Sequence, residues 1–334
     1  MLGRSSQGAA VQMPIAGDLP DLDGATAWLN SEPLTPAGLR GQVVLVEFCT
    51  YSCVNWLRTI PYVQAWSDRY RDHGLVVIGA HSPEFGFEHD VEKVQTALRS
   101  MGVDFPIAVD SDFAVWRAFD NAYWPALYFA DAEGRIRHHH FGEENYERSE
   151  RVIQQLIADA GRDGFGEGLV SVEPDGVELA ADWKTLESPE TYVGYARASG
   201  FASPGGLVRD RSHVYEEPSQ LDLNQWSLAG DWTLARQPAT LNEPGGRIAH
   251  RFHARDLNLV LGTQADGGPV RFLVLIDGEP PDGAGGIDLD GEGNGTVTES
   301  RCYQLIRQPG SVSDRTFEIT FLDAGVQAYV FTFG

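Results

Sequence analysis

The stretch Val46-Glu-Phe-Cys-Thr-Tyr-Ser-Cys-Val-Asn-Trp56 joins a strand pattern to a helix pattern. Residues 43–48, VVLVEF, form an apolar run suited to a buried strand. From Cys53 to Tyr70 apolar residues recur at helical spacing, so we expect a helix to begin at Cys53. A sulfur at that place faces unpaired backbone N–H groups and the positive end of the helix dipole, which stabilise a thiolate. The stretch therefore predicts that Cys53 is a nucleophile. The alternative is that Cys53 is only a small apolar residue buried in the core.

The rest of the first half alternates strand-like and helix-like stretches. Strands are expected at residues 75–80 and 106–109, and a hairpin at residues 126–129 and 136–141. Helices are expected at residues 91–101, 114–119 and 147–160. This alternation predicts an α/β layered domain over residues 1–165.

The second half has a different pattern. Residues 166–189, rich in glycine and acidic side chains, are predicted to form a linker. Beyond them, short alternating stretches are separated by turn residues, and strands are expected at residues 227–234, 248–253, 257–261, 270–276, 302–306, 316–321 and 327–333. Short strands without helices predict an all-β, jelly-roll-like sandwich over residues 190–334.

Composition limits the classes of partner. The 334 residues carry 25 Lys and Arg against 48 Asp and Glu, a net charge of −23, which argues against nucleic acid as the main partner. No apolar run is long enough to span a bilayer, so no membrane insertion is expected. Residues 1–20 lack the apolar core of a signal peptide, and three cysteines fit a reduced compartment, so a cytoplasmic location is expected. An extracytoplasmic location is expected instead if the chain is a fragment of a membrane-tethered parent.

The cysteine stretch resembles the active site of TlpA/DipZ-like redoxins, thioredoxin-fold proteins in which Phe-Trp-Thr-Tyr-Ser-Cys-x-Asn-Cys opens the first long helix. The chain retains six of these residues, namely Phe48, Thr50, Tyr51, Ser52, Cys53 and Asn55. Further similarities are Pro61, His81-Ser-Pro-Glu84-Phe, His140-Phe-Gly-Glu143, Pro189-Glu-Thr-Tyr192, Phe252-His-Ala-Arg-Asp256 and Phe331-Thr-Phe-Gly334. The resemblance implies a thioredoxin fold followed by a carbohydrate-binding-module-like sandwich.

The resemblance also implies roles for individual residues. Glu47 lies where the family has a buried carboxylate beneath the dithiol, which implies a proton relay. Trp124-Pro125 matches the family's cis-proline, which packs beside the nucleophilic sulfur. The active-site wall is then expected to consist of Thr50, Tyr51, Trp56, Trp124 and Pro125.

The chain departs from the family at the second cysteine of its Cys-x-x-Cys pair. Trp56 occupies that position, while Cys49 occupies the position of the family's tryptophan, as if the two were exchanged. Dithiol exchange needs a second thiol to resolve the mixed disulfide. Three hypotheses follow. Cys49 resolves in place of residue 56, or Cys53 acts alone with an external thiol, or the redox chemistry is lost.

Three functions remain open. The first is thiol–disulfide oxidoreductase activity on protein or small-molecule thiols, with no dissociable cofactor and no metal expected. The second is a redox-silent scaffold whose sandwich binds a glycan or a protein, with Trp226, Trp232 and Tyr303 either stacking on a sugar or packing in the core. The third is a single-cysteine, peroxiredoxin-like peroxidase, suggested by Thr50-x-x-Cys53, although Val46 stands where that signature has proline.

Overall fold

The computed structural model describes residues 13–166, 168–264 and 267–334. The chain divides into two compact units, the first ending at Glu173 and the second beginning at Pro174. This division falls inside the predicted linker. Val170 N–H still bonds to Glu150 of the first unit, whereas Gly176 and Ala180 accept hydrogen bonds from arginines of the second.

A seven-stranded sheet forms the centre of the first unit, in the order β1-β7-β6-β3-β4-β5-β2. Its strands are β1 Gly17–Asp18, β2 Ala27–Leu29, β3 Val43–Cys49, β4 Leu75–His81, β5 Ile107–Val109, β6 Ala126–Ala130 and β7 Arg135–Phe141. The central strand β3 runs parallel to β4 and antiparallel to β6. The helices are α1 Val54–Tyr70, α2 Val91–Ser100, α3 Ala114–Ala118 and α4 Tyr146–Asp159, with 3-10 turns η1 Arg71–His73 and η2 Gly86–His89.

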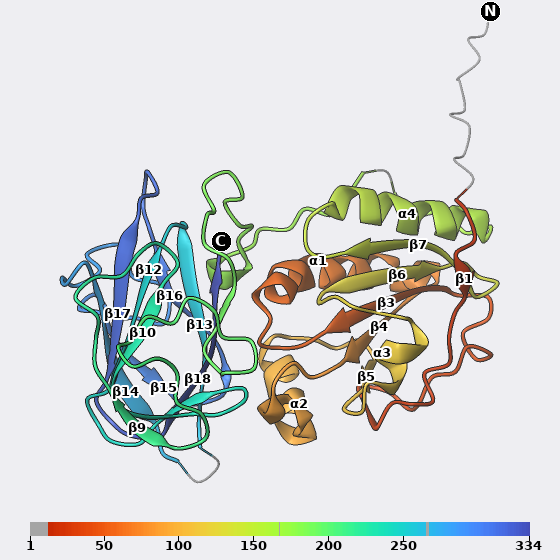
Figure 1. The fold of residues 1–334 in the computed structure, drawn as a ribbon. Coiled ribbons are helices and arrows are strands. Elements are labelled where there is room, and N and C mark those ends of the chain that lie inside the picture. Colours follow the sequence, from red (N-terminus) through yellow and green to blue (C-terminus); the bar gives the residue numbers. More distant parts are fainter. Residues whose placement is uncertain (1–12, 167, 265–266) are drawn as a thin grey trace, which may run out of the picture. The chain divides into compact units, whose positions relative to one another are not determined.

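The alternation of β3 sends its side chains to opposite faces of this sheet. Phe48 packs edge-on against Trp116 and Phe119, at centroid distances of 5.6 and 5.2 Å, in and beside α3. Glu47 and Cys49 lie on the other face, which α1 and α4 cover (Figure 1). The chain leaves β3 at Cys49 and enters α1 at Val54, so residues 50–53 form the loop between the central strand and the first long helix.

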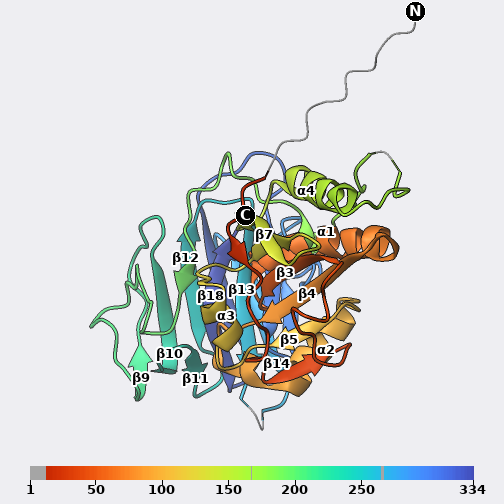
Figure 2. The ribbon, with the colours of Figure 1, turned by 90° about the vertical axis from the view of Figure 1, so that its right-hand side faces the viewer.

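The second unit is a sandwich with β10 common to both layers. Its strands are β8 Thr191–Tyr192, β9 Ser212–Tyr215, β10 Trp226–Leu234, β11 Ala239–Leu241, β12 Arg247–Phe252, β13 Asp256–Thr263, β14 Val270–Ile276, β15 Asn294–Val297, β16 Arg301–Arg307, β17 Arg315–Phe321 and β18 Val326–Phe333. The first half of β10 pairs with β12 and the second half with β11, the change occurring at Gly230. Gly230 has a φ of 90° and lies so close to Gly246 that a Cβ would approach its Cα to 3.0 Å. Figure 2 shows β13 and β18, which pair antiparallel, side by side in one layer.

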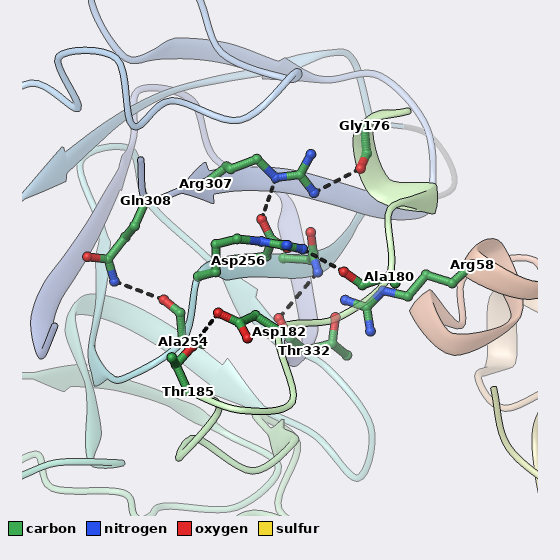
Figure 3. Close-up of polar contacts among 12 residues, drawn as sticks. Arg58, Gly176, Ala180, Asp182, Thr185, Ala254, Asp256, Arg307, Gln308 and Thr332 are labelled. Atoms are coloured by element: carbon green, nitrogen blue, oxygen red, sulfur yellow. Dashed lines mark hydrogen bonds and ion pairs between the residues drawn. The ribbon is translucent and has the colours of Figure 1, made fainter. Parts of the chain in front are cut away.

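Aromatic and branched side chains fill the space between the two layers. Phe317 of β17 meets Phe331 of β18 edge-on at 5.9 Å. Trp226, Trp232 and Tyr303 are fully buried here, so their rings belong to the core and are not available to stack on a sugar. The 3-10 turn η3, Gly176–Glu178, and the following residues are held by a buried ionic cluster centred on Asp256 (Figure 3).

The fold class predicted from the sequence is confirmed. The first unit has the thioredoxin fold and the second is a β-sandwich. Helices α1 to α4 and the longer strands lie within about two residues of their predicted bounds, whereas the 3-10 turns were not predicted. The short strands β1, β2, β8, β9, β11 and β15 were not predicted, because their few residues carry no clear periodicity. Among the described residues, no helix is both long and apolar enough to cross a bilayer.

Candidate active site at the start of the first long helix

Cys53 occupies the N-cap of α1. Its backbone is extended, with φ −76° and ψ 117°, and its carbonyl accepts the N–H of Leu57. The first turn of the helix contains no acidic residue that would oppose a negative charge on the sulfur. The side chain is partly exposed, and Sγ lies 4.0 Å from the carbonyl oxygen of Trp124. The Trp124–Pro125 peptide bond is cis, as the resemblance implies.

Cys49 lies below this position, as the last residue of β3. It is fully buried, and a Cβ at Gly79 of β4 would lie 3.6 Å from its Sγ. Burial raises the pKa of the Cys49 thiol well above its ordinary value, and the neighbouring Glu47, Glu88 and Cys53 raise it further. Cys49 and Cys53 are both thiols in this structure. Cys49 is therefore a protonated, sheltered thiol, whereas Cys53 reaches the surface.

Glu47 is fully buried beneath the loop, two residues before Cys49 on the same face of β3. The indole N–H of Trp56 donates a hydrogen bond to its Oε2 at 3.4 Å. Its Oε1 is buried and has no hydrogen-bond partner among the described residues. Burial raises the pKa of Glu47 to about 8, although the Trp56 hydrogen bond lowers it in part. The carboxyl group is therefore protonated at pH 7 and able to exchange a proton near that pH.

Trp56 occupies the position of the family's second cysteine. Its side chain is fully buried and points from the first turn of α1 down to Glu47. The other residues expected to form the wall divide into two groups. Thr50 and Tyr51 are buried with Trp56 on the inner side of the loop, whereas the partly exposed Trp124 lies beside Cys53.

Glu88 holds the loop in place, a role the sequence analysis missed. Its Oε1 accepts both the N–H and the hydroxyl of Ser52, at 3.3 and 2.6 Å. Its Oε2 accepts the N–H groups of Glu84 and Phe85, at 2.7 and 2.9 Å. Glu88 is the third residue of η2, a position where acidic residues commonly cap a helix. Its spacing of three residues from the N-cap Phe85 could have indicated this capping role in the sequence. Its contact with Ser52, 36 residues away, was not readable from the sequence.

His81, at the end of β4, was also not assigned to the site. It is the register partner of Cys49, and its ring stacks on Tyr51 at a centroid distance of 5.8 Å. The ring is fully buried, and neither Nδ1 nor Nε2 has a hydrogen-bond partner among the described residues. Burial lowers the pKa of His81 to about 4, so the imidazole is neutral at pH 7.

The next residue, Ser82, joins the two sides of the site. Its N–H donates to the carbonyl of Cys49 at 3.1 Å, and its own carbonyl accepts the indole N–H of Trp124 at 3.1 Å. The end of β3 and the loop before β6 are therefore linked through the end of β4. This arrangement keeps the Trp124 carbonyl next to Cys53.

The His140-Phe-Gly-Glu143 similarity has a structural basis. Glu143 forms an ion pair of 3.0 Å with Arg58 of α1, and both side chains are almost fully buried. The ring of His140 contacts the Glu143 backbone carbonyl at 3.1 Å. These contacts fix the first turns of α1 against the loop between β7 and α4. No group of three or more His, Cys, Asp or Glu side chains among the described residues is arranged to hold a metal ion.

Comparison with known proteins identifies the family of the chain. Residues 188–334 match the thioredoxin-like C-terminal domain family. The thiol-disulfide oxidoreductase YkuV of Bacillus subtilis is 31% identical over 147 residues, which make up 44% of this chain and 99% of YkuV. The chain belongs to the DipZ-like redoxins.

Two further proteins are similar to this chain. Protein DipZ of Mycobacterium tuberculosis is 38% identical over 284 residues, 84% of this chain but only 39% of DipZ. The chain thus spans about two fifths of the length of that relative. A thioredoxin-like protein solved in its oxidised form is 33% identical and covers 43% of this chain and 96% of its own, with a TM-score of 0.40.

Proposed function

We propose that this DipZ-like redoxin is a thiol–disulfide oxidoreductase in which Cys53 is the nucleophile and Cys49 the resolving thiol. The observation that carries the proposal is the placement of Cys53, partly exposed at the amino end of α1 and 4.0 Å from the Trp124 carbonyl. The positive end of the helix dipole at this place favours a thiolate. YkuV, which covers the same fold at 31% identity, is named for this activity.

The exchange then proceeds in two displacements. The Cys53 thiolate attacks a substrate disulfide, a Cys53–substrate bond forms, and the other substrate sulfur leaves with the electron pair and takes up a proton. Cys49 then loses its proton and attacks the Cys53 sulfur. The mixed disulfide breaks, the second substrate sulfur leaves as a thiol, and Cys49 and Cys53 become a disulfide. The substrate gains two electrons and the protein loses two.

Glu47 supports this chemistry as a proton relay. Its carboxyl group is buried on the face that holds Cys49, and one of its oxygens has no hydrogen-bond partner in the part of the chain that the structure describes. With its pKa raised to about 8, it exchanges protons in the range where thiols titrate.

Reduction of insulin by dithiothreitol, followed by turbidity, tests the nucleophile. Cys53→Ser is expected to remove all of the rate above that of dithiothreitol alone. Cys302→Ser, in β16 of the sandwich, is the matched control and should retain the full rate. A Cys53→Ser variant as active as the parent would refute the proposal.

The peroxidase alternative predicts a different outcome. A lone Cys53 would consume hydrogen peroxide with an external thiol, and Cys49→Ser would leave the turnover intact. Thr50, whose hydroxyl would orient the peroxide in that hypothesis, is fully buried. This burial favours disulfide exchange over peroxide reduction.

A further inference from the structure

We propose that His81 takes the proton of Cys49 when Cys49 attacks the mixed disulfide on Cys53. This inference rests on the proposed dithiol function and names the group that makes a buried thiol reactive. Cys49 is fully buried, so bulk water does not reach it to take its proton.

The pairing of β3 with β4 places His81 next to Cys49. The two are Cα partners in a parallel ladder, where neighbouring strands lie about 4.8 Å apart. Register partners point to the same face, and Gly79, two residues earlier on that face, has no side chain. The Cys49 sulfur lies over Gly79, only 3.6 Å from where a Cβ would stand. The sulfur therefore lies against β4 at Gly79, the position that precedes His81 on the same face of that strand.

The ring of His81 has hydrogen-bonding capacity that the fold does not use. Both nitrogens are buried without a partner among the described residues, a state that is unfavourable for a polar group. A neutral imidazole keeps a lone pair on one nitrogen and therefore accepts a proton. Stacking on Tyr51 fixes the plane of the ring.

The other ionisable groups around Cys49 and His81 are less suited to this step. Glu47, with its pKa raised to about 8, is mostly protonated at pH 7, so in its relay role it gives a proton more readily than it takes one. Both oxygens of Glu88 already accept hydrogen bonds, Oε1 from Ser52 and Oε2 from the backbone N–H of Glu84. Cys53 is bonded to the substrate at this stage. His89 lowers the pKa of His81 as a smaller contribution after burial.

The proton transfer balances within the second displacement. The Cys49 S–H bond breaks as an N–H bond forms on His81, and the Cys49 electron pair forms the bond to the Cys53 sulfur. The bond between Cys53 and the substrate breaks, and its electron pair leaves on the substrate sulfur. The imidazolium gives its proton to that sulfur, so no charge remains in the buried site.

Stopped-flow reaction of the reduced Cys302→Ser protein with the aromatic disulfide DTNB separates the two displacements. Attack by Cys53 releases one nitrothiobenzoate, and attack by Cys49 on the resulting mixed disulfide releases a second. His81→Phe keeps an aromatic ring on Tyr51 but has no proton acceptor. It should leave the first rate unchanged and slow the second at least about tenfold at pH 7, with the defect shrinking at higher pH as hydroxide takes the proton.

His250→Phe is the matched control. His250 is also buried without a hydrogen-bond partner among the described residues, but it lies in β12 of the sandwich. His250→Phe should change neither rate. His81→Gln is a second variant of the site, and an unchanged release of the first nitrothiobenzoate would show that its site is intact. An unchanged second rate in both His81 variants across the pH range would overturn the role of His81 alone. A parent protein that releases only one nitrothiobenzoate would overturn the dithiol function, and this inference with it.

Discussion

The two units treat a fully buried carboxylate differently. In the sandwich, Asp256 accepts hydrogen bonds from Arg307 on one oxygen, at 2.6 Å, and from Arg255 on the other, at 2.6 and 3.0 Å. In the thioredoxin unit, Glu47 accepts one long bond from Trp56, and its second oxygen is unpaired among the described residues. Buried ionisable groups are normally paired because an uncompensated one is costly. The unpaired group therefore marks a place where stability is not the only requirement.

His250 shows that a single unpaired group is not enough to mark a site. Its ring is buried against Phe331 and Phe333, at centroid distances of 4.9 and 5.3 Å, and burial lowers its pKa to about 3. It is a neutral ring in an apolar core. What distinguishes the thioredoxin unit is that Glu47, His81 and Cys49 lie together on one face, below the partly exposed Cys53.

The largest change in stability is expected from the paired group. Asp256→Ala leaves two arginines without their carboxylate and releases the backbone carbonyls of Gly176 and Ala180 that those arginines hold (Figure 3). Removing one partner of a buried ionic cluster costs about 3–5 kcal/mol. Urea unfolding of the sandwich measures this loss. Asp314→Ala, which breaks the more exposed ion pairs with Arg251 and His253, is the control and should cost much less stability than Asp256→Ala.

Glu47→Gln is expected to remove a pH dependence of stability in the thioredoxin unit. The folded-state pKa of Glu47, about 8, lies above its ordinary value of 4.5, so the folded state binds the proton more tightly than the unfolded state. The parent should therefore lose stability as pH rises from about 4.5 to 8, by about 4 kcal/mol relative to Glu47→Gln.

Unfolding midpoints of the parent and of Glu47→Gln at about pH 5, 7 and 9 measure this difference in stability. The exposed Glu92→Gln on α2 is the matched control and should follow the parent at every pH. Identical pH profiles for the parent and Glu47→Gln would show that the carboxyl group is paired or solvated in solution.

His250→Phe should give the smallest effect. Replacing an unpartnered ring among phenylalanines with another aromatic ring removes buried polar atoms, so stability should change by less than about 1 kcal/mol or increase. Thermal unfolding measures it. A large loss of stability would mean that the His250 nitrogens are hydrogen-bonded in solution. His250 would then no longer serve as an unpartnered buried histidine to compare with His81.

The strand and the helix that carry the two cysteines could be predicted from the sequence, but the distant residues that contact this site could not. The apolar run of β3 and the helical spacing after Cys53 are local patterns, and they predicted both the strand and the start of α1. Glu88 and His81 act through residues that are distant in the sequence, namely Ser52 and Cys49. Such partners are set by strand register and loop closure, which a single sequence does not specify. The inward direction of Trp56, toward Glu47, likewise depends on tertiary packing.

The proposed function requires that Cys49 and Cys53 form a disulfide with each other when the substrate is reduced. Alkylation of the Cys302→Ser protein before and after mild oxidation, followed by intact mass and peptide mapping, tests it most directly. Both thiols are expected to be alkylated in the reduced protein, and oxidation is expected to protect both and to link their peptides by a disulfide. Full alkylation of Cys49 and Cys53 after oxidant treatment would show that the two thiols do not form a disulfide.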